Sequence, residues 1–131
     1  MIRDPRPGTE EIPKVLVVED HILVRVVIAE ALREAGMRVI EVGNVDEAMV
    51  HLEAGTPIDF VFTDIELPGS MNGLQFVRWL QARRPDLKLL MTSGGLPAHE
   101  SIPAGQFIPK PYDVANVVAF IRAAVDEPPP E

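Results

Sequence analysis

The sequence predicts an α/β fold in which five parallel strands form one sheet with helices on both faces. Short apolar runs alternate along the chain with longer segments whose apolar residues recur at helical spacing. The segment 60–62, FVF, is continuously apolar before Asp64, as in a strand that is buried on both faces. Parallel strands require crossover connections, and the intervening helical segments supply them.

The first strand is expected over residues 14–18, KVLVV, where branched aliphatic residues lead to Glu19-Asp20. An amphipathic helix then runs to about residue 35 and ends at Gly36, because glycine commonly terminates helices. Its core-facing stripe has helical spacing and comprises Val24, Val27, Ile28, Ala31, Leu32 and Ala35.

The same two patterns predict the later elements, each bounded by glycine, proline or a polar capping residue. The third strand ends at Asp64, after which Leu-Pro-Gly at 67–69 forces the chain out of the sheet. In the helix that follows, Leu74, Val77 and Leu80 are predicted to face inward. The approximate ranges are a strand at 37–42, a helix between Asn44 or Asp46 and Gly55, a strand at 58–63, a helix at 72–84, strands at 87–92 and 106–109, and a helix at 114–125.

The connection between the fourth and fifth strands departs from this pattern, because residues 94–105 contain three glycines and two prolines. Ala98 to Ile102 leaves room for about one helical turn, so the fourth helix is expected to be reduced or absent. Right-handed crossovers leave few topologies. The expected one is the flavodoxin-like three-layer fold with strand order 2-1-3-4-5.

One domain is expected over residues 14–125, since a chain of 131 residues allows one compact core and little more. Residues 1–13 and 126–131 are rich in proline and charge and are expected to be disordered. No apolar run of about 18 residues and no signal-peptide core occur in the sequence. A cytoplasmic protein without membrane contact is therefore expected.

Charge and composition exclude several classes of function. Twenty acidic against 12 basic residues give a formal net charge of −8, which argues against direct nucleic-acid binding. The chain has no cysteine, so disulfides and thiolate metal sites are excluded.

Polar side chains follow four of the predicted strands at the point where each strand ends. Glu19 and Asp20 follow the first strand, Asp64 ends the third, Ser93 follows the fourth and Lys110 the fifth. Open α/β sheets bind ligands at this edge, so the five side chains are expected in one crevice. Three neighbouring carboxylates repel one another unless a cation joins them, and their oxygen ligands suit Mg²⁺ or Mn²⁺.

This combination favours phosphoryl transfer, which needs in-line positioning and neutralisation of the phosphoryl oxygens. Asp64 alone would more often be a turn-capping acid, but its four neighbours favour a nucleophile that forms an aspartyl phosphate. The Lys110 ammonium suits a phosphoryl oxygen, and the Ser93 hydroxyl can donate to another.

Four motifs, VLVVED, FTDIELPG, MTSG and FIPKPY, occur in an order and spacing that resemble the receiver domain of two-component response regulators. The resemblance covers roughly residues 14–125. It implies that Asp64 is the phosphorylated residue, that Asp20 binds the metal directly, and that Glu19 acts through water. The third protein ligand of the metal would be the backbone carbonyl of Glu66.

The resemblance also implies a switch pair, Ser93 and Phe107, and a phosphoryl-binding lysine at Lys110 in a cis peptide with Pro111. Glu19 stands where aspartate is commoner in this family. A missing fourth helix would remove part of the face through which typical receivers act. The Glu66 side chain is expected to lie over the phosphoryl group and to modulate its hydrolysis.

The first helix carries apolar residues in addition to its core-facing stripe: Ile22, Leu23, Val26 and Ala29. Three of them have i, i+4, i+7 spacing and begin beside the acid pair, which is typical of an interface. We expect this strip to dock the helical bundle of a histidine kinase or histidine phosphotransfer protein.

The sequence therefore predicts a phosphoacceptor switch of a phosphorelay rather than an enzyme that turns over a separate substrate. No effector domain fits after Val125, so output is expected through a downstream protein partner. A receiver module from a hybrid histidine kinase is the alternative. An aspartyl-phosphate phosphatase would need a cap domain, and a flavin carrier would need a Ser/Thr/Gly-rich loop where Glu19 and Asp20 stand.

Overall fold

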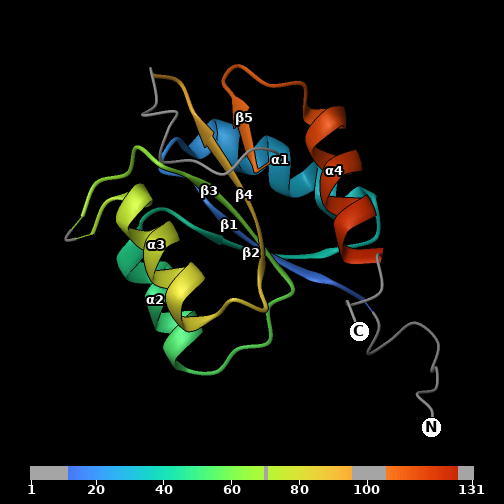
Figure 1. Ribbon diagram of the computed structural model, residues 1–131. Coiled ribbons are helices and arrows are strands. Elements are labelled where there is room, and N and C mark those ends of the chain that lie inside the picture. Colours follow the sequence, from blue (N-terminus) through green and yellow to red (C-terminus); the bar gives the residue numbers. More distant parts are fainter. Residues whose placement is uncertain (1–11, 70, 96–105, 127–131) are drawn as a thin grey trace, which may run out of the picture.

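The computed structural model describes residues 12–69, 71–95 and 106–126. Its centre is a sheet of five parallel strands in the order β2-β1-β3-β4-β5, as predicted. Helices α1 and α4 cover one face of the sheet and α2 and α3 cover the other, which makes three layers (Figure 1). This is the flavodoxin-like arrangement.

The elements agree with the predicted ranges to within about two residues. The strands are β1 (Lys14–Val18), β2 (Arg38–Val42), β3 (Phe60–Asp64), β4 (Lys88–Ser93) and β5 (Phe107–Pro109). The helices are α1 (Ile22–Glu34), α2 (Val45–Glu53), α3 (Gly73–Arg83) and α4 (Val114–Asp126).

Strands β1 and β3 bury alternate side chains on opposite faces of the sheet. Leu16 and Val18 of β1 belong to the core beneath α2 and α3, whereas Val15 and Val17 belong to the core beneath α1 and α4. Every residue of β3 is buried, so continuous apolarity before Asp64 did indicate a strand covered on both faces.

Side-chain caps explain where two helices begin. Asn44, and not Asp46, is the N-cap of α2 and accepts a hydrogen bond from Glu47 N–H at 2.8 Å. Asn72 and Gln75 form a reciprocal capping box at the start of α3, with both hydrogen bonds at 2.9 Å. These contacts fix the entry of both helices on the same face of the sheet.

The buried faces of α1 and α3 were predicted partly wrong. Val27, assigned to the core-facing stripe, is 54% exposed, whereas Ala29, assigned to the docking strip, is fully buried. In α3 the buried Phe76 was missed, and Leu74 is only half-buried. Helix α1 packs against both β2 and α4, so two neighbours rather than one sheet face define its buried arc.

Several expectations fall outside the described residues. They are the loop in place of a fourth helix, in the segment 96–105, and most of the two ends that were expected to be disordered, namely residues 1–11 and 127–131. Asp126 was assigned to the disordered tail, but it is the last residue of α4. Among the residues that the structure describes, no helix has the length and apolarity needed to cross a membrane.

Candidate functional site

Asp64 is the centre of the site and ends β3, the middle strand of the sheet. Its side chain is almost fully buried, with 4% of the residue exposed. One carboxylate oxygen, Oδ1, accepts the backbone N–H of Glu66 at 2.8 Å. The other, Oδ2, accepts a hydrogen bond from Lys110 Nζ at 2.7 Å. The predicted acceptor is therefore held in one orientation at the carboxyl edge of the sheet.

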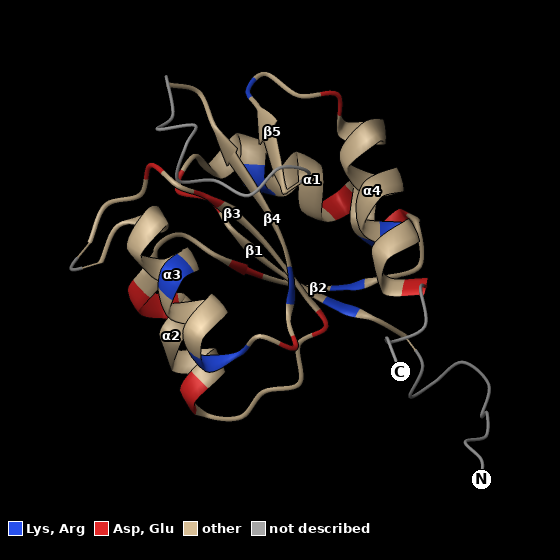
Figure 2. Cartoon of the chain, in the orientation of Figure 1, with Lys and Arg blue, Asp and Glu red and all other residues tan. Residues whose placement is uncertain are grey.

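The loop after β1 brings two further acids to Asp64. Carboxylate oxygens of Glu19, Asp20 and Asp64 lie within 4.8 Å of one another. Glu19 is 3% exposed, whereas Asp20 is open to solvent. Figure 2 shows acidic positions at the end of the sheet where β3 ends, and a basic position just after β5. The predicted crevice exists.

The donor set of this group fits a hard divalent cation. All three side chains offer oxygen, and the solvent-exposed Asp20 leaves a side on which water can complete the coordination. Three carboxylates against the single Lys110 ammonium leave an excess of two negative charges in the cluster. The residues present therefore suit Mg²⁺ or Mn²⁺, with one acid exposed and two buried.

Lys110 joins the two buried acids. Its Nζ donates to Glu19 Oε1 at 2.8 Å and to Asp64 Oδ2 at 2.7 Å. Burial by itself lowers the pKa of Lys110, but the hydrogen bonds to Asp64 and Glu19 outweigh it and raise the pKa above its usual range. Lys110 is therefore protonated at neutral pH. Its peptide bond to Pro111 is cis, as expected.

Ser93 ends β4 beside Asp64 and is 2% exposed. Its backbone carbonyl accepts Lys110 N–H at 2.9 Å, so the serine and the lysine are joined through the main chain. The Ser93 hydroxyl oxygen accepts Gly95 N–H at 3.1 Å. The hydroxyl is thus held at the sheet edge, where the sequence placed it.

Two further residues, Glu66 and Phe107, were also expected in the site. Glu66 turns its carboxylate toward the end of β4, where Oε1 accepts Gly94 N–H at 3.2 Å. Phe107 in β5 is half-buried and packs against the core beneath α2 and α3. Its role as a switch with Ser93 stays a prediction.

Sequence reasoning missed two residues that support the site. Arg25 of α1 donates from Nη1 to the backbone carbonyl of Glu19 at 3.1 Å, and its Nε lies 3.5 Å from Glu41 Oε1. The side chain thereby ties the acidic turn to β2. Nothing in the one-dimensional pattern distinguishes Arg25 from a solvated residue on the polar face of a helix.

Tyr112 is the other missed residue, although its place directly after Lys110-Pro111 was a usable signal. Its ring meets Phe62 edge-on, with centroids 5.6 Å apart. Burial raises the pKa of Tyr112 to about 12, and the negative charge of Glu19 acts in the same direction. The ring lies against the strand that carries Asp64.

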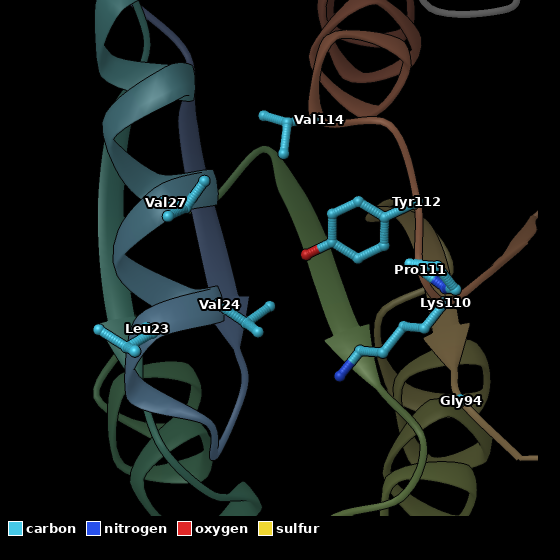
Figure 3. Close-up of a pocket in the computed structure, with 8 residues that line it drawn as sticks. All are labelled: Leu23, Val24, Val27, Gly94, Lys110, Pro111, Tyr112 and Val114. Carbon is cyan, nitrogen blue, oxygen red and sulfur yellow. The ribbon is translucent and has the colours of Figure 1, made fainter.

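An apolar pocket of about 580 Å³ adjoins the site (Figure 3). Helix α1 contributes Leu23, Val24 and Val27 on one side, and Lys110, Pro111, Tyr112 and Val114 lie opposite. The exposed apolar surface of α1 comprises Ile22, Leu23, Val26 and Val27, which are 62%, 71%, 41% and 54% exposed. Ala29 does not belong to it, because it faces the core. Three of the four predicted docking residues are therefore on the surface.

A buried carboxylate held by a lysine, beside two more acids at the edge of a parallel sheet, is the arrangement of a phosphoacceptor signalling domain. The chain belongs to the response regulator receiver domain family, whose model matches residues 15–122. The predicted membership of the receiver family is thus confirmed. The structure also brings residues of the separate motifs together at one edge of the sheet.

Two curated relatives illustrate the relationship. The chain is 30% identical over 116 residues to the DNA-binding transcriptional regulator NtrC of Salmonella typhimurium, which covers 85% of this chain and 24% of that protein. It is 30% identical over 127 residues to the transcriptional regulatory protein FixJ of Azorhizobium caulinodans, covering 88% and 56%. The chain spans about a quarter of the length of NtrC and about half of FixJ.

Solved receiver structures share the fold. A response regulator receiver protein from Sinorhizobium medicae superposes with a TM-score of 0.80 at 23% identity, covering 90% of this chain and 98% of that one. A CheY-like receiver domain protein from Methanospirillum hungatei gives a TM-score of 0.79 at 22% identity, covering 88% and 94%. At these identities the likeness concerns the fold.

Proposed function

We propose that this chain takes a phosphoryl group from a phosphohistidine onto Asp64 and thereby acts as a switch in a phosphorelay. The observation that carries this proposal is the pair of contacts at Asp64. Lys110 and the Glu66 backbone N–H each bind one of its two carboxylate oxygens. Glu19 and Asp20 supply further carboxylate oxygens with which Asp64 could hold a divalent cation. Membership of the receiver family supports the same role.

In the transfer step, a carboxylate oxygen of Asp64 forms a bond to phosphorus. The bond between phosphorus and the donor imidazole nitrogen breaks, the electron pair stays on that nitrogen, and the nitrogen takes a proton from solvent. Lys110 stabilises negative charge on the transferred oxygens, and the Ser93 hydroxyl can donate to another oxygen. Water later attacks phosphorus and releases inorganic phosphate, which restores Asp64. The chain is therefore an autocatalytic switch and not an enzyme with a separate substrate.

Glu19, Asp20, Asp64 and the Glu66 carbonyl are the residues that would hold Mg²⁺. A divalent cation supplies charge neutralisation for the phosphoryl oxygens and for the excess negative charge of the acid cluster. Asp20 is the exposed member and the proposed direct ligand, whereas Glu19 already accepts hydrogen bonds from Lys110 and from His21 N–H at 3.0 Å. This difference supports the assignment of Glu19 to a water-mediated role.

The phosphodonor is proposed to be a histidine kinase or histidine phosphotransfer protein that docks on the exposed apolar surface of α1. This surface adjoins the pocket that Lys110 lines, so a helix bundle seated there lies next to the acceptor crevice. Output through a downstream protein partner belongs to the same proposal.

Incubation with Mg²⁺ and acetyl phosphate tests the acceptor role. The expected result is a gain of one phosphoryl group, seen by intact-mass measurement and absent from Asp64→Asn. Asp59→Asn is a matched control, because Asp59 accepts Lys14 N–H at the opposite end of β3. A phosphoryl group that persists in Asp64→Asn would overturn the proposal.

A further inference from the structure

We propose that the Glu66 carboxylate occupies a backbone donor of the acceptor site and keeps it from an incoming phosphoryl group. An incoming phosphoryl group would thus have to displace the Glu66 side chain from this donor. This role rests on the proposed function, because it concerns the donors that surround Asp64. The contacts at the ends of β3 and β4 carry it.

Glu66 serves the site through two different groups. Its backbone N–H donates to Asp64 Oδ1 at 2.8 Å, which fixes the acceptor. Its side chain turns the other way and crosses to the end of β4, where Oε1 accepts Gly94 N–H at 3.2 Å. The carboxylate thereby joins two loops that are 28 residues apart in the sequence.

Gly95 leaves the space that this carboxylate fills. A Cβ atom built on Gly95 would lie 2.4 Å from Glu66 Oε2 and 3.4 Å from Glu66 Cδ. Real Cβ atoms essentially never approach a heavy atom to 2.4 Å. Because the far end of a glutamate side chain can rotate, alanine at this position would displace the carboxylate rather than the backbone.

The Gly94 N–H, to which the Glu66 carboxylate is bonded, lies at the same edge of the sheet as Asp64. Asp64 pairs with Thr92 across the β3–β4 ladder, and Gly94 follows two residues later, just after Ser93. The phosphoryl group of an aspartyl phosphate carries about two negative charges, in place of the single charge of the Asp64 carboxylate, and three acceptor oxygens. It needs N–H donors on the β4 side, where the Gly94 N–H is bonded to a carboxylate.

The phosphoryl oxygens and the Glu66 carboxylate carry charge of the same sign and compete for one N–H group. They therefore exclude each other at Gly94, and the site binds a phosphoryl group more weakly than it would without this carboxylate. Gly95 and Glu66 act as one unit in this respect, because the first makes room for the second.

The test measures binding of beryllofluoride, a non-covalent phosphoryl analogue, in the presence of Mg²⁺, from backbone amide signals in NMR titrations. Glu66→Ala and Gly95→Ala are each expected to lower the dissociation constant about fivefold, the effect of one net hydrogen bond. The double variant is expected to show no further gain, since both changes remove the same contact. Without ligand, the Gly94 amide proton is expected to shift in both single variants.

Glu53→Ala is the matched control, because Glu53 is an exposed glutamate at the far end of α2. Failure of the wild type to bind beryllofluoride, or equal binding by Asp64→Asn, would overturn the proposed function itself. Wild-type binding that Asp64→Asn abolishes, with Glu66→Ala unchanged or weaker, would overturn only the role of Glu66. The role of Glu66 would also be overturned if Gly95→Ala raised the affinity for beryllofluoride as much in the Glu66→Ala variant as in the wild type.

Discussion

Lys110 Nζ lies 2.7 Å from Asp64 Oδ2, although the two residues are 46 positions apart in the chain. The same ammonium lies 2.8 Å from Glu19 Oε1, so one cation serves two carboxylates that are both almost fully buried. Buried carboxylates without a partner are strongly unfavourable. The contact between Lys110, Asp64 and Glu19 is therefore the structural centre of the site. Replacing the lysine leaves two buried carboxylates without their cation, which destabilises the fold.

Lys110→Met is expected to lower the free energy of unfolding by about 3 kcal/mol at neutral pH, because it leaves two buried carboxylates without a cation. Urea denaturation measures the change. Adding Asp64→Asn to this variant is expected to restore part of the loss, since it removes one of the uncompensated charges. Arg78→Met removes an exposed positive charge from α3 and is the control. Equal midpoints for Lys110→Met and the control would contradict the prediction.

Arg25→Met is expected to weaken divalent-cation binding several-fold and to destabilise the fold by about 1 kcal/mol, the net contribution of a lost hydrogen bond. Arg25 orders the turn that carries Glu19 and Asp20, through its bond to the Glu19 carbonyl. Calorimetric titration with Mg²⁺ measures the binding. Arg33→Met is the control, because Arg33 also pairs with Glu41, at 3.0 Å, but donates nothing to the Glu19 carbonyl. The same loss of affinity in both variants would rule out a specific role for Arg25.

The single tyrosine of the chain is expected to ionise in the folded protein at a pH of about 12. Its pKa in an unfolded chain is about 10. The contribution of Tyr112 to stability is therefore complete below about pH 10 and is lost as the pH rises toward 12, where the unfolded chain has already released its proton.

The ultraviolet absorbance of tyrosinate measures this titration directly. Glu19→Gln removes a negative charge that raises the pKa of Tyr112, so this variant is expected to titrate at lower pH. A folded-state midpoint near 10 in the wild type would show that burial against Phe62 does not protect the phenol.

Val26→Glu is expected to slow phosphotransfer from a phosphorylated histidine-containing protein at least tenfold, because it places a charge within the exposed apolar surface of α1. Acetyl phosphate does not need a docking surface, so its rate is expected to stay unchanged. Val50→Glu is a matched control on α2, where Val50 is 67% exposed on the other face of the sheet. An equal effect of both substitutions, or none of Val26→Glu, would remove α1 as the docking helix.

Hydrophobic periodicity predicted the parallel strands and the site together, whereas the strand order was predicted from right-handed crossovers and the flavodoxin-like topology. Runs buried on both faces, such as 60–62, indicate parallel strands, and parallel strands direct all their carboxyl ends to one edge. The polar residues at the carboxyl ends of these strands therefore had to meet, and Glu19, Asp64, Ser93 and Lys110 do so. These residues were predictable because their positions depend on topology and not on side-chain packing.

The errors concern helix faces. Ala29 and Val27 were assigned to the wrong sides of α1, because periodicity identifies an apolar stripe but not its centre. The approach of α4 and β2 decides which part of the stripe is covered. Phe76 of α3 was missed because the predicted inward stripe of Leu74, Val77 and Leu80 is not centred on the face that is buried.

The amino-acid sequence by itself determined the fold class, the order of the strands and the five polar residues at one edge of the sheet, since these follow from local patterns and chain connectivity. Only the tertiary structure decided that Arg25 binds the Glu19 carbonyl, that Tyr112 lies against Phe62, and that Glu66 reaches Gly94. Such contacts depend on side-chain directions and on distances between separate loops, which no pattern within a single segment records.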